Sequence, residues 1–191
     1  MLQLKKMVSI QIGQNFRCRL ENVKKSNAYV IQMKDLTEDN RLNCDSLFGI
    51  DIDEINGKYL IKKNDILFRS RGKTNTAVLV DQEVAYTVVS SPLYRIRVLT
   101  NNVTPAYLCW FINHPSSQLY FAKMAKGTSV QMIDKKTLGE LKIYVPSLDI
   151  QDKVVTLNNL SNKEQKIIKE ILNKRQIYMD AFLMKLVSEQ R

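Results

Sequence analysis

A short basic segment from Arg69 to Thr74 holds the residue types best suited to bind an anion. Arginine can form two parallel hydrogen bonds with a phosphate or with the edge of guanine, hydroxyls and backbone amides also hold phosphate, and glycine permits close approach. A solvated basic hairpin tip would explain the same composition without a partner, and both interpretations stay open. The candidate DNA contacts in this segment are Arg69, Ser70, Arg71, Lys73 and Thr74.

A second candidate segment follows Lys126, where the expected end of a helix and its loop would present donors on one side. Gly127 alone would explain this segment as a helix C-cap and a turn, so two interpretations stand here as well. Its candidate DNA contacts are Lys126, Thr128, Ser129, Gln131, Lys135 and Lys136. Weaker candidates, which no pattern fixes, are Gln32, Lys34, Arg41 and Asn43.

The charge of the chain favours a polyanionic partner. With 29 Lys and Arg against 19 Asp and Glu, the formal net charge is +10. Most of this excess lies before residue 151, in the part of the sequence with strand and short-helix patterns. Many basic proteins bind no nucleic acid, so charge alone does not decide the function.

Residues for catalysis, for metal binding or for a cofactor are scarce. Cys18, Cys44 and Cys109 are far apart and form no Cys-x-x-Cys pair, and His114 is the only histidine. No Asn or Asp is followed by Pro-Pro and an aromatic residue, and no Gly-rich loop follows a strand to hold a nucleotide or a methyl donor. We therefore expect no catalytic residue, no metal and no cofactor of the chain's own.

One enzymatic alternative is a metal-dependent nuclease. It would be built on Asp134, Glu140 and Lys142, because two carboxylates and a lysine can hold a metal ion and an attacking water. That spacing arises often by chance. Lys142 also falls in an alternating strand pattern, which explains it as a surface position.

The first two thirds of the sequence predict a compact antiparallel or barrel-like sheet. Turn-rich stretches at 37–41 and 51–57 are expected to be surface loops. The strand patterns lie around Ile10 and Ile12 and at 28–31, 59–61, 66–68, 77–80, 84–90, 93–99 and 141–145.

Two short helices are expected after the strands. Thr104-Pro105 supplies an N-cap and a proline at the first helical position, and Pro115 ends that helix. A second helix over 116–125 would end at Gly127. Residues expected in the core are Leu108, Trp110, Phe111 and Ile112 in the first helix and Leu119, Tyr120, Ala122 and Met124 in the second.

A single long helix is predicted for 150–188, which contain neither Gly nor Pro. Some 38 helical residues would extend about 57 Å, far more than a small domain needs as a cap. A coiled coil with a second copy or a related helix would cover the apolar stripe, and folding back onto the domain is the alternative. Glu164 and Lys174 interrupt this stripe, whose apolar members are Leu157, Leu160, Ile167, Ile171 and Tyr178. A stripe shifted by one residue would include Ile168 and Arg175 instead. The predicted organisation is thus an α+β domain at 1–148 and a helix at 149–191.

Several ordered motifs resemble the target-recognition domains of type I restriction-modification specificity subunits. Within 104–155 they are a Tyr-Leu-x-Trp-Phe-x-Asn helix, a Gly-Thr-Ser loop with Met-Ile-x-Lys-x-x-Leu after it, and a strand ending at Val145-Pro146. Leu148-Asp149-Ile150-Gln151 then opens the long helix. Upstream, 29–36 and 63–72 are similar to two further landmarks, although Asn64 replaces the usual glycine before Asp65.

The resemblance implies a non-catalytic recognition domain that lies on duplex DNA. Its long helix would pair in antiparallel fashion with a like helix and dock methyltransferase subunits and, where one exists, a restriction subunit. Such subunits usually carry two domains and two helices, whereas this chain has one of each. A homodimer would then read a symmetric, bipartite site.

The alternative function is a coiled-coil decoy that captures those subunits without reading DNA. The start of the chain has no apolar run of signal-peptide length, and no stretch approaches the ~18 apolar residues of a membrane span. We therefore expect a cytoplasmic protein.

Overall fold

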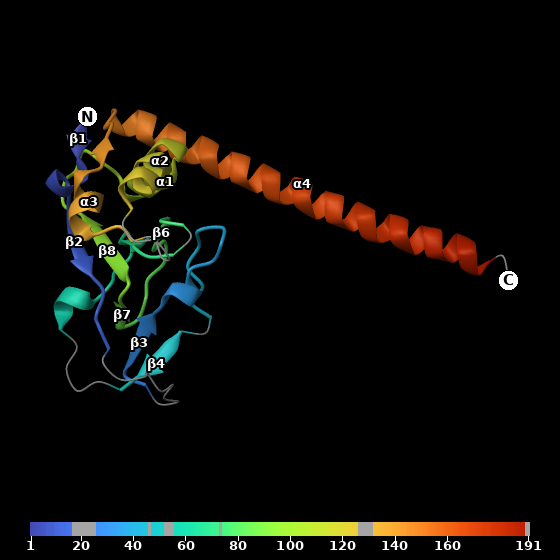
Figure 1. Ribbon diagram of the computed structural model, residues 1–191, viewed down its shortest axis with the longest axis horizontal. Coiled ribbons are helices and arrows are strands. Elements are labelled where there is room, and N and C mark those ends of the chain that lie inside the picture. Colours follow the sequence, from blue (N-terminus) through green and yellow to red (C-terminus); the bar gives the residue numbers. More distant parts are fainter. Residues whose placement is uncertain (17–25, 46, 52–55, 73, 126–131, 190–191) are drawn as a thin grey trace. The chain divides into compact units, whose positions relative to one another are not determined.

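The computed structural model describes residues 1–16, 26–45, 47–51, 56–72, 74–125 and 132–189 (Figure 1). The chain divides into two compact units, Met1–Gln151 and Asp152–Arg191. The first unit is an α+β domain, and the described part of the second belongs to one long helix. This confirms the predicted fold class.

A four-stranded antiparallel sheet forms the centre of the first unit, in the order β2-β8-β5-β6. Its register places Ile10 opposite Ile96, and Ile96 opposite Ile66. These β-branched side chains are buried, as expected for a strand face turned towards the core. The strands are β2 (Val8–Ile12), β5 (Ile66–Arg69), β6 (Ala77–Leu79) and β8 (Leu93–Val98).

A second, three-stranded sheet has the order β4-β3-β7, with β3 antiparallel to β4 and parallel to β7. Its strands are β3 (Ala28–Ile31), β4 (Phe48–Ile50) and β7 (Thr87–Val89), and a separate pair joins β1 (Leu2–Gln3) to β9 (Lys142–Ile143). The sheets are open, so the expectation of a barrel-like closure was wrong. The strands are too short, and their pairings too few, to close a barrel.

The central sheet buries both faces because successive side chains of a strand point to opposite sides. On one side, the Phe68 ring contacts Phe121 of a helix, with the ring centroids 5.3 Å apart. On the other side, Leu67 belongs to an apolar cluster with Ile31 and Val89 of the second sheet. The domain is therefore layered as helices, central sheet and second sheet.

Helices α1 (Pro105–Asn113) and α2 (Pro115–Met124) confirm the two predicted helices. Thr104 Oγ1 accepts a hydrogen bond from the Tyr107 N–H, as an N-cap does. The apolar side predicted for α2 was wrong, however. Leu119 is 63% exposed, whereas Phe121 is buried together with Ser117. Met124 is exposed as well, because the face of α2 that meets the sheet is the one that carries Ser117 and Phe121.

A third helix, α3 (Lys135–Glu140), stands where the sequence indicated only a connection to the last strand. Asp134 is its N-cap, since its Oδ1 accepts the Thr137 N–H at 2.7 Å. The last strand is correspondingly short and is limited to β9.

The expected strand at 59–61 was also wrong, because this stretch begins with the 3-10 turn η3 (Gly57–Tyr59). Two further 3-10 turns are η1 (Leu4–Lys6) and η2 (Met33–Asp35).

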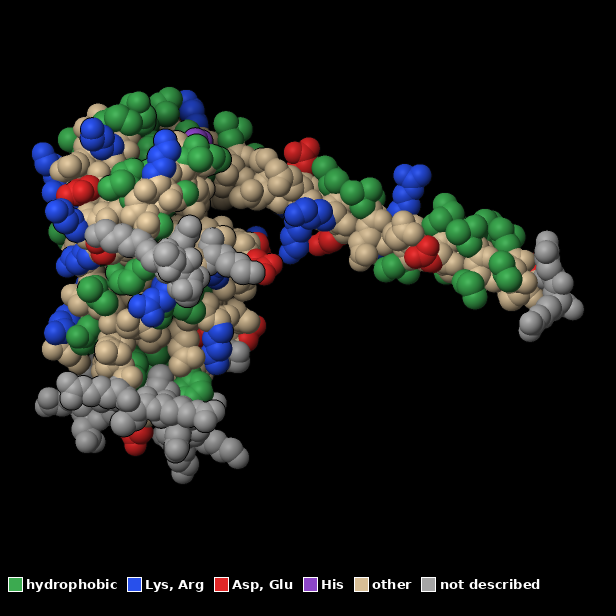
Figure 2. All heavy atoms as spheres, in the orientation of Figure 1, with side chains coloured by type: hydrophobic (Ala, Val, Ile, Leu, Met, Phe, Trp, Pro, Cys, Tyr) green, Lys and Arg blue, Asp and Glu red, His purple; other side chains and the backbone are tan. Residues whose placement is uncertain are grey.

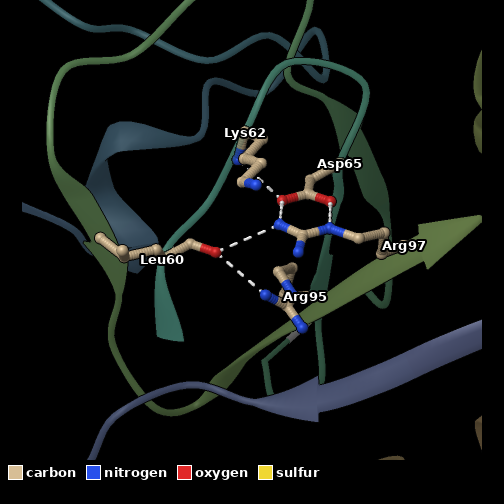
Figure 3. A network of polar contacts seen from close by, with 5 residues as sticks. All are labelled: Leu60, Lys62, Asp65, Arg95 and Arg97. Atoms are coloured by element: carbon tan, nitrogen blue, oxygen red, sulfur yellow. Dashed lines mark hydrogen bonds and ion pairs between the residues drawn. The ribbon is translucent and has the colours of Figure 1, made fainter. Parts of the chain in front are cut away.

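An ion pair between the buried Asp65 and the half-buried Arg97 fixes the turn that leads into β5 (Figure 3). The Asp65 carboxylate accepts bonds from Nε and Nη2 of Arg97, both at 2.7 Å, and from the Lys62 N–H at 2.8 Å. Arg95 and Arg97 also donate to the Leu60 carbonyl. The bond to Asp65 raises the pKa of Arg97, whereas burial and the neighbouring charge of Arg97 lower the pKa of Arg95.

The long helix α4 (Leu148–Ser188) agrees with the predicted span. Its first turn belongs to the first unit, where the fully buried Gln151 accepts the Thr104 N–H and donates to the carbonyls of Asn102 and Pro146. At about 1.5 Å per residue the helix is about 61 Å long. No helix among the described residues is both long enough and apolar enough for a membrane span.

Candidate nucleic-acid interface

The end of β5 directs two arginines to different parts of the domain. Arg69 is the last residue of the strand, and Arg71 follows it after one intervening residue. Arg69 contacts the segment 36–43, and Arg71 contacts the segment 132–136. Three segments that are far apart in the sequence are therefore joined at this point. We call 36–43, 69–72 with 74–76, and 132–136 together the three-segment surface.

Arg69 supports the backbone of the segment 36–43. Its Nη2 donates to the carbonyl of Leu36 and, at 3.0 Å, to that of Thr37. Burial of the guanidinium lowers the pKa of Arg69, although the nearby Glu38 acts in the opposite direction. The group thus holds a turn in place and is only partly available to an outside partner.

Ser70 lies fully inside the domain. Its side chain has no exposed surface, and its Oγ donates to the Pro92 carbonyl. Its own carbonyl accepts the Ile133 N–H at 2.8 Å. The hydroxyl of Ser70 also bonds with Tyr94, whose pKa is raised mainly by burial and lowered in part by that bond. Ser70 therefore positions the segment 132–136.

Arg71 is exposed and is the accessible arginine of the pair. Its backbone pairs with Met132 in an isolated antiparallel bridge, and its Nη2 approaches the Met132 sulfur at 3.7 Å. Gly72 follows with a φ of +124°, a conformation that side chains other than glycine rarely adopt. Thr74 is exposed, and the buried Asn75 amide donates to the Arg69 carbonyl, which closes the turn.

The segment 36–43 carries two of the weaker candidates at its surface. The Arg41 N–H donates to Thr37 Oγ1, and the exposed Arg41 side chain forms an ion pair with Asp39 at 3.4 Å. Asn43 is exposed, and its N–H donates to the Asp35 carbonyl. Lys34 lies nearby with its Nζ 5.3 Å from the centre of the Phe48 ring, whereas Gln32 is half-buried.

Lys135 and Lys136 are exposed at the start of α3. Together with Lys5 of η1 they line an open hollow of about 600 Å³, which also has Ser9 and Ile10 in its wall. Figure 2 shows Lys and Arg side chains along the edge of the domain where β1, β2 and α3 lie in Figure 1. No pattern in the sequence joins Lys5 to this cluster, because only the packing of α3 against η1 brings these residues together.

Five predicted contacts lie outside the described residues: Lys73, Lys126, Thr128, Ser129 and Gln131. The structure thus assigns internal bonds to Arg69 and Ser70, and it leaves Arg71, Thr74, Lys135 and Lys136 at the surface.

The residues of the nuclease alternative have other surroundings. The Asp134 carboxylate caps α3, Glu140 ends that helix, and Lys142 is exposed on β9. Among the residues that the structure describes, no group of three His, Cys, Asp or Glu side chains could hold a metal ion. Cys109 is buried, which raises the pKa of its thiol to about 12, so this thiol stays protonated at neutral pH.

The second unit presents an apolar stripe along α4. A single helix cannot cover its own stripe, and Leu157, Leu160 and Ile171 are 66%, 59% and 58% exposed. The apolar surface widens beyond residue 177, where Tyr178 and Phe182 stack with their ring centroids 6.3 Å apart. Ile177, Met179, Leu183, Met184, Leu186 and Val187 are exposed around them. An apolar surface on several sides of one helix is typical of a helix with more than one neighbour.

A family model described as the type I restriction modification DNA specificity domain matches residues 22–174. No curated protein matches the chain.

Three solved structures share the fold at low sequence identity. The crystal structure of the HsdS subunit from Thermoanaerobacter tengcongensis has a TM-score of 0.60 and 14% identity, covering 88% of this chain and 38% of that one. The type I S subunit from M. genitalium gives 0.55 and 14%, covering 85% and 38%. A chain from work on assembly and conformational transition of the type I restriction-modification system gives 0.66 and 16%, covering 97% and 42%. The chain thus spans about two fifths of the length of these relatives.

Proposed function

Because the chain belongs to the type I restriction-modification DNA specificity domain family, we propose that it recognises one half-site in duplex DNA for partner methyltransferase subunits. The family is one of DNA-binding specificity subunits, which are not catalysts. Methyl transfer, and cleavage where a restriction subunit is present, would then be carried out by separate subunits. These partners would also bind the methyl donor and any ATP.

The observation that carries this proposal is the divergence of Arg69 and Arg71 at the end of β5. It joins three segments into one surface, on which exposed side chains of the kind that donate to DNA lie beside the exposed carboxylates of Glu38 and Asp39. The donors come from every segment: Arg41 and Asn43, Arg71 and Thr74, and Lys135 and Lys136.

The exposed donors differ in what they can read. The lysines act as point charges, so we assign Lys135 and Lys136, with the neighbouring Lys5, to phosphates of the DNA backbone. Arg71 and Asn43 have the planar groups that can form two bonds with guanine and adenine, respectively. We therefore assign base recognition to the side of the surface around Arg71 and orientation on the duplex to the side around α3.

The apolar stripe of α4 is the proposed site of assembly. Pairing with the same helix of a second copy would cover Leu157, Leu160, Ile167, Ile171 and Tyr178. The wider apolar surface beyond residue 177 leaves room for helices of methyltransferase subunits. A homodimer with two-fold symmetry would place two identical domains on DNA and would read a symmetric, bipartite site.

Charge reversal at Arg71 tests the DNA-reading part of this proposal. We expect Arg71→Glu to weaken binding to a short fluorescent duplex by at least tenfold, because a lost contact becomes a repulsion near the phosphates. Lys63→Glu makes the same type of reversal at an exposed turn that is not part of the three-segment surface, and it should change affinity far less. Arg69 is the poorer choice, because its reversal would also release the carbonyls of Leu36 and Thr37.

Two results would count against DNA reading. If the unaltered chain formed a stable complex with a methyltransferase subunit but bound no duplex at low salt, the decoy function would be favoured. If Arg71→Glu and Lys63→Glu weakened binding equally, the binding would reflect net charge and the three-segment surface would have no special role.

A further inference from the structure

Two opposite charges interrupt the apolar stripe of α4. The stripe follows a spacing of three and four residues through 157, 160, 164, 167, 171, 174 and 178. Glu164 and Lys174 occupy two of these positions, ten residues apart, and both are exposed. A charge in the seam between two helices lowers stability unless the partner helix compensates it, and such residues fix the orientation and register of helices.

The family resemblance implies that two copies of α4 pair in antiparallel fashion. We propose that this pairing is in register around Lys169, with Glu164 of each copy opposite Lys174 of the other. This inference rests on the proposed function and specifies its dimer. Positions equally far from Lys169 then face each other. Leu160 faces Tyr178 of the second copy, and Ile167 faces Ile171. The two-fold axis generates the Glu164 to Lys174 ion pair twice.

A parallel pairing in register would have the opposite effect. It would place Glu164 against its own copy and Lys174 against its own copy within the seam. Like charges facing one another in an interface are unfavourable, so the charge pattern selects against this arrangement. In the antiparallel orientation, Glu164 and Lys174 of the two copies instead form pairs of opposite charge, which attract.

Antiparallel pairings in other registers lose the ion pairs. A shift by one heptad brings Glu164 opposite either Ile167 or Ala181 of the second copy. The same shifts bring Lys174 opposite either Leu157 or Ile171. Both charges would then be removed from water without a partner, which costs far more than an exposed charge does. Of these three registers, the one centred on Lys169 matches charge with charge and apolar with apolar.

Gln151 is the last residue of α4 that belongs to the first unit. This register pairs each residue of α4 from 151 to 187 with one of the second copy. It also places the two Gln151 residues about 54 Å apart along the helix axis, from a rise of about 1.5 Å per residue.

A charge-swap experiment tests the pairing. The full-length chain and its variants are compared by sedimentation equilibrium, which gives the dissociation constant of the dimer. We expect Glu164→Lys and Lys174→Glu each to weaken the dimer about tenfold, because each replaces two opposite-charge pairs with two like-charge pairs. The double variant should return to within about threefold of the unaltered chain. The differences should shrink as salt is raised.

A matched control is Lys166→Glu, an exposed reversal on α4 outside the stripe, which should leave the dimer unchanged. Circular dichroism checks that each variant keeps its helix. An unchanged dissociation constant in both single variants would overturn this register while leaving DNA reading intact. A double variant that dimerises no more tightly than the single variants would do the same. A chain that stays monomeric would overturn the proposed homodimer as well. Failure of DNA reading shows separately, in the Arg71 experiment.

Discussion

Single residues that resemble family landmarks have internal roles in this domain. Asp65 accepts three hydrogen bonds inside the turn before β5. Asn113 forms two bonds with the backbone of Ala77, at 2.7 and 2.8 Å, and so covers the free edge of β6. Because Asp65 and Asn113 bond within the domain, the motifs that contain them indicate the fold. They do not indicate which DNA sequence the domain reads.

Asn64 shows how a departure from the motif is accommodated. It replaces the glycine that usually precedes the aspartate, and its φ is +71°. Asparagine adopts this left-handed region more readily than other residues with a side chain, so the turn keeps its shape. The turn that leads into β5 is therefore compatible with asparagine at this position.

The ion pair of Asp65 with Arg97 stabilises the folded domain. We expect Asp65→Asn to lower the free energy of unfolding by about 3 kcal/mol, because Arg97 and the buried Arg95 would lose the carboxylate that compensates them. Urea unfolding measures this as a lower midpoint with an unchanged slope. Asp81→Asn makes the same change at an exposed position and should stay within about 0.5 kcal/mol. An equal loss in both variants would show that the ion pair has no particular role.

The residues of the interface could be predicted only in part. Composition predicts an anion-binding segment, but it cannot show which of its side chains turn inward. Arg69 and Ser70 bond to carbonyls that are 22 or more positions away in the sequence, and no local pattern reveals such partners. Lys5 was missed for the same reason. Their DNA contacts, like those of Arg71, stay predictions.

At the scale of elements, local signals predicted the helices that have them. Thr104-Pro105 marks the start of α1, and the lack of Gly and Pro marks α4. Helix α3 was missed because it is only six residues long and contains Gly139, a poor helix former. The buried face of α2 was missed because its length gives too few apolar positions to define one side.

Gly139 has a packing reason that yields a prediction for α3. A Cβ at this position would meet Lys5 Cβ at 3.2 Å and Ile10 Cδ1 at 3.8 Å. Leucine is a better helix former than glycine, yet we expect Gly139→Leu to destabilise the domain by about 1–3 kcal/mol, because the larger side chain pushes α3 away from η1 and β2. Thermal unfolding measures the effect.

The control for α3 is Gly57→Leu, since a Cβ at Gly57 has no atom within 4 Å and its backbone is not in the left-handed region. This variant should be close to neutral. If Gly139→Leu were instead more stable than the unaltered chain, the close seating of α3 against Lys5 would be wrong. The position proposed for Lys135 and Lys136 on DNA would then need revision.

At the scale of the whole molecule, an α+β recognition domain and a long helix could both be predicted from the sequence. The openness of the sheets could not, because strand patterns do not specify which edges pair. The coiled coil also stays a prediction, because it depends on a second helix. The chain spans about two fifths of the length of its structural relatives.

The most direct test of the proposed DNA recognition is to express the chain together with a type I methyltransferase subunit and to map methylated bases across the host genome. We predict methylation at one symmetric, bipartite motif, and its loss when the chain is shortened after Gln151, because the two domains would no longer be joined by α4. Arg71→Glu should abolish the same methylation with α4 intact. A stable complex that adds no new methylation would contradict DNA reading, and an asymmetric motif would contradict pairing of two identical copies.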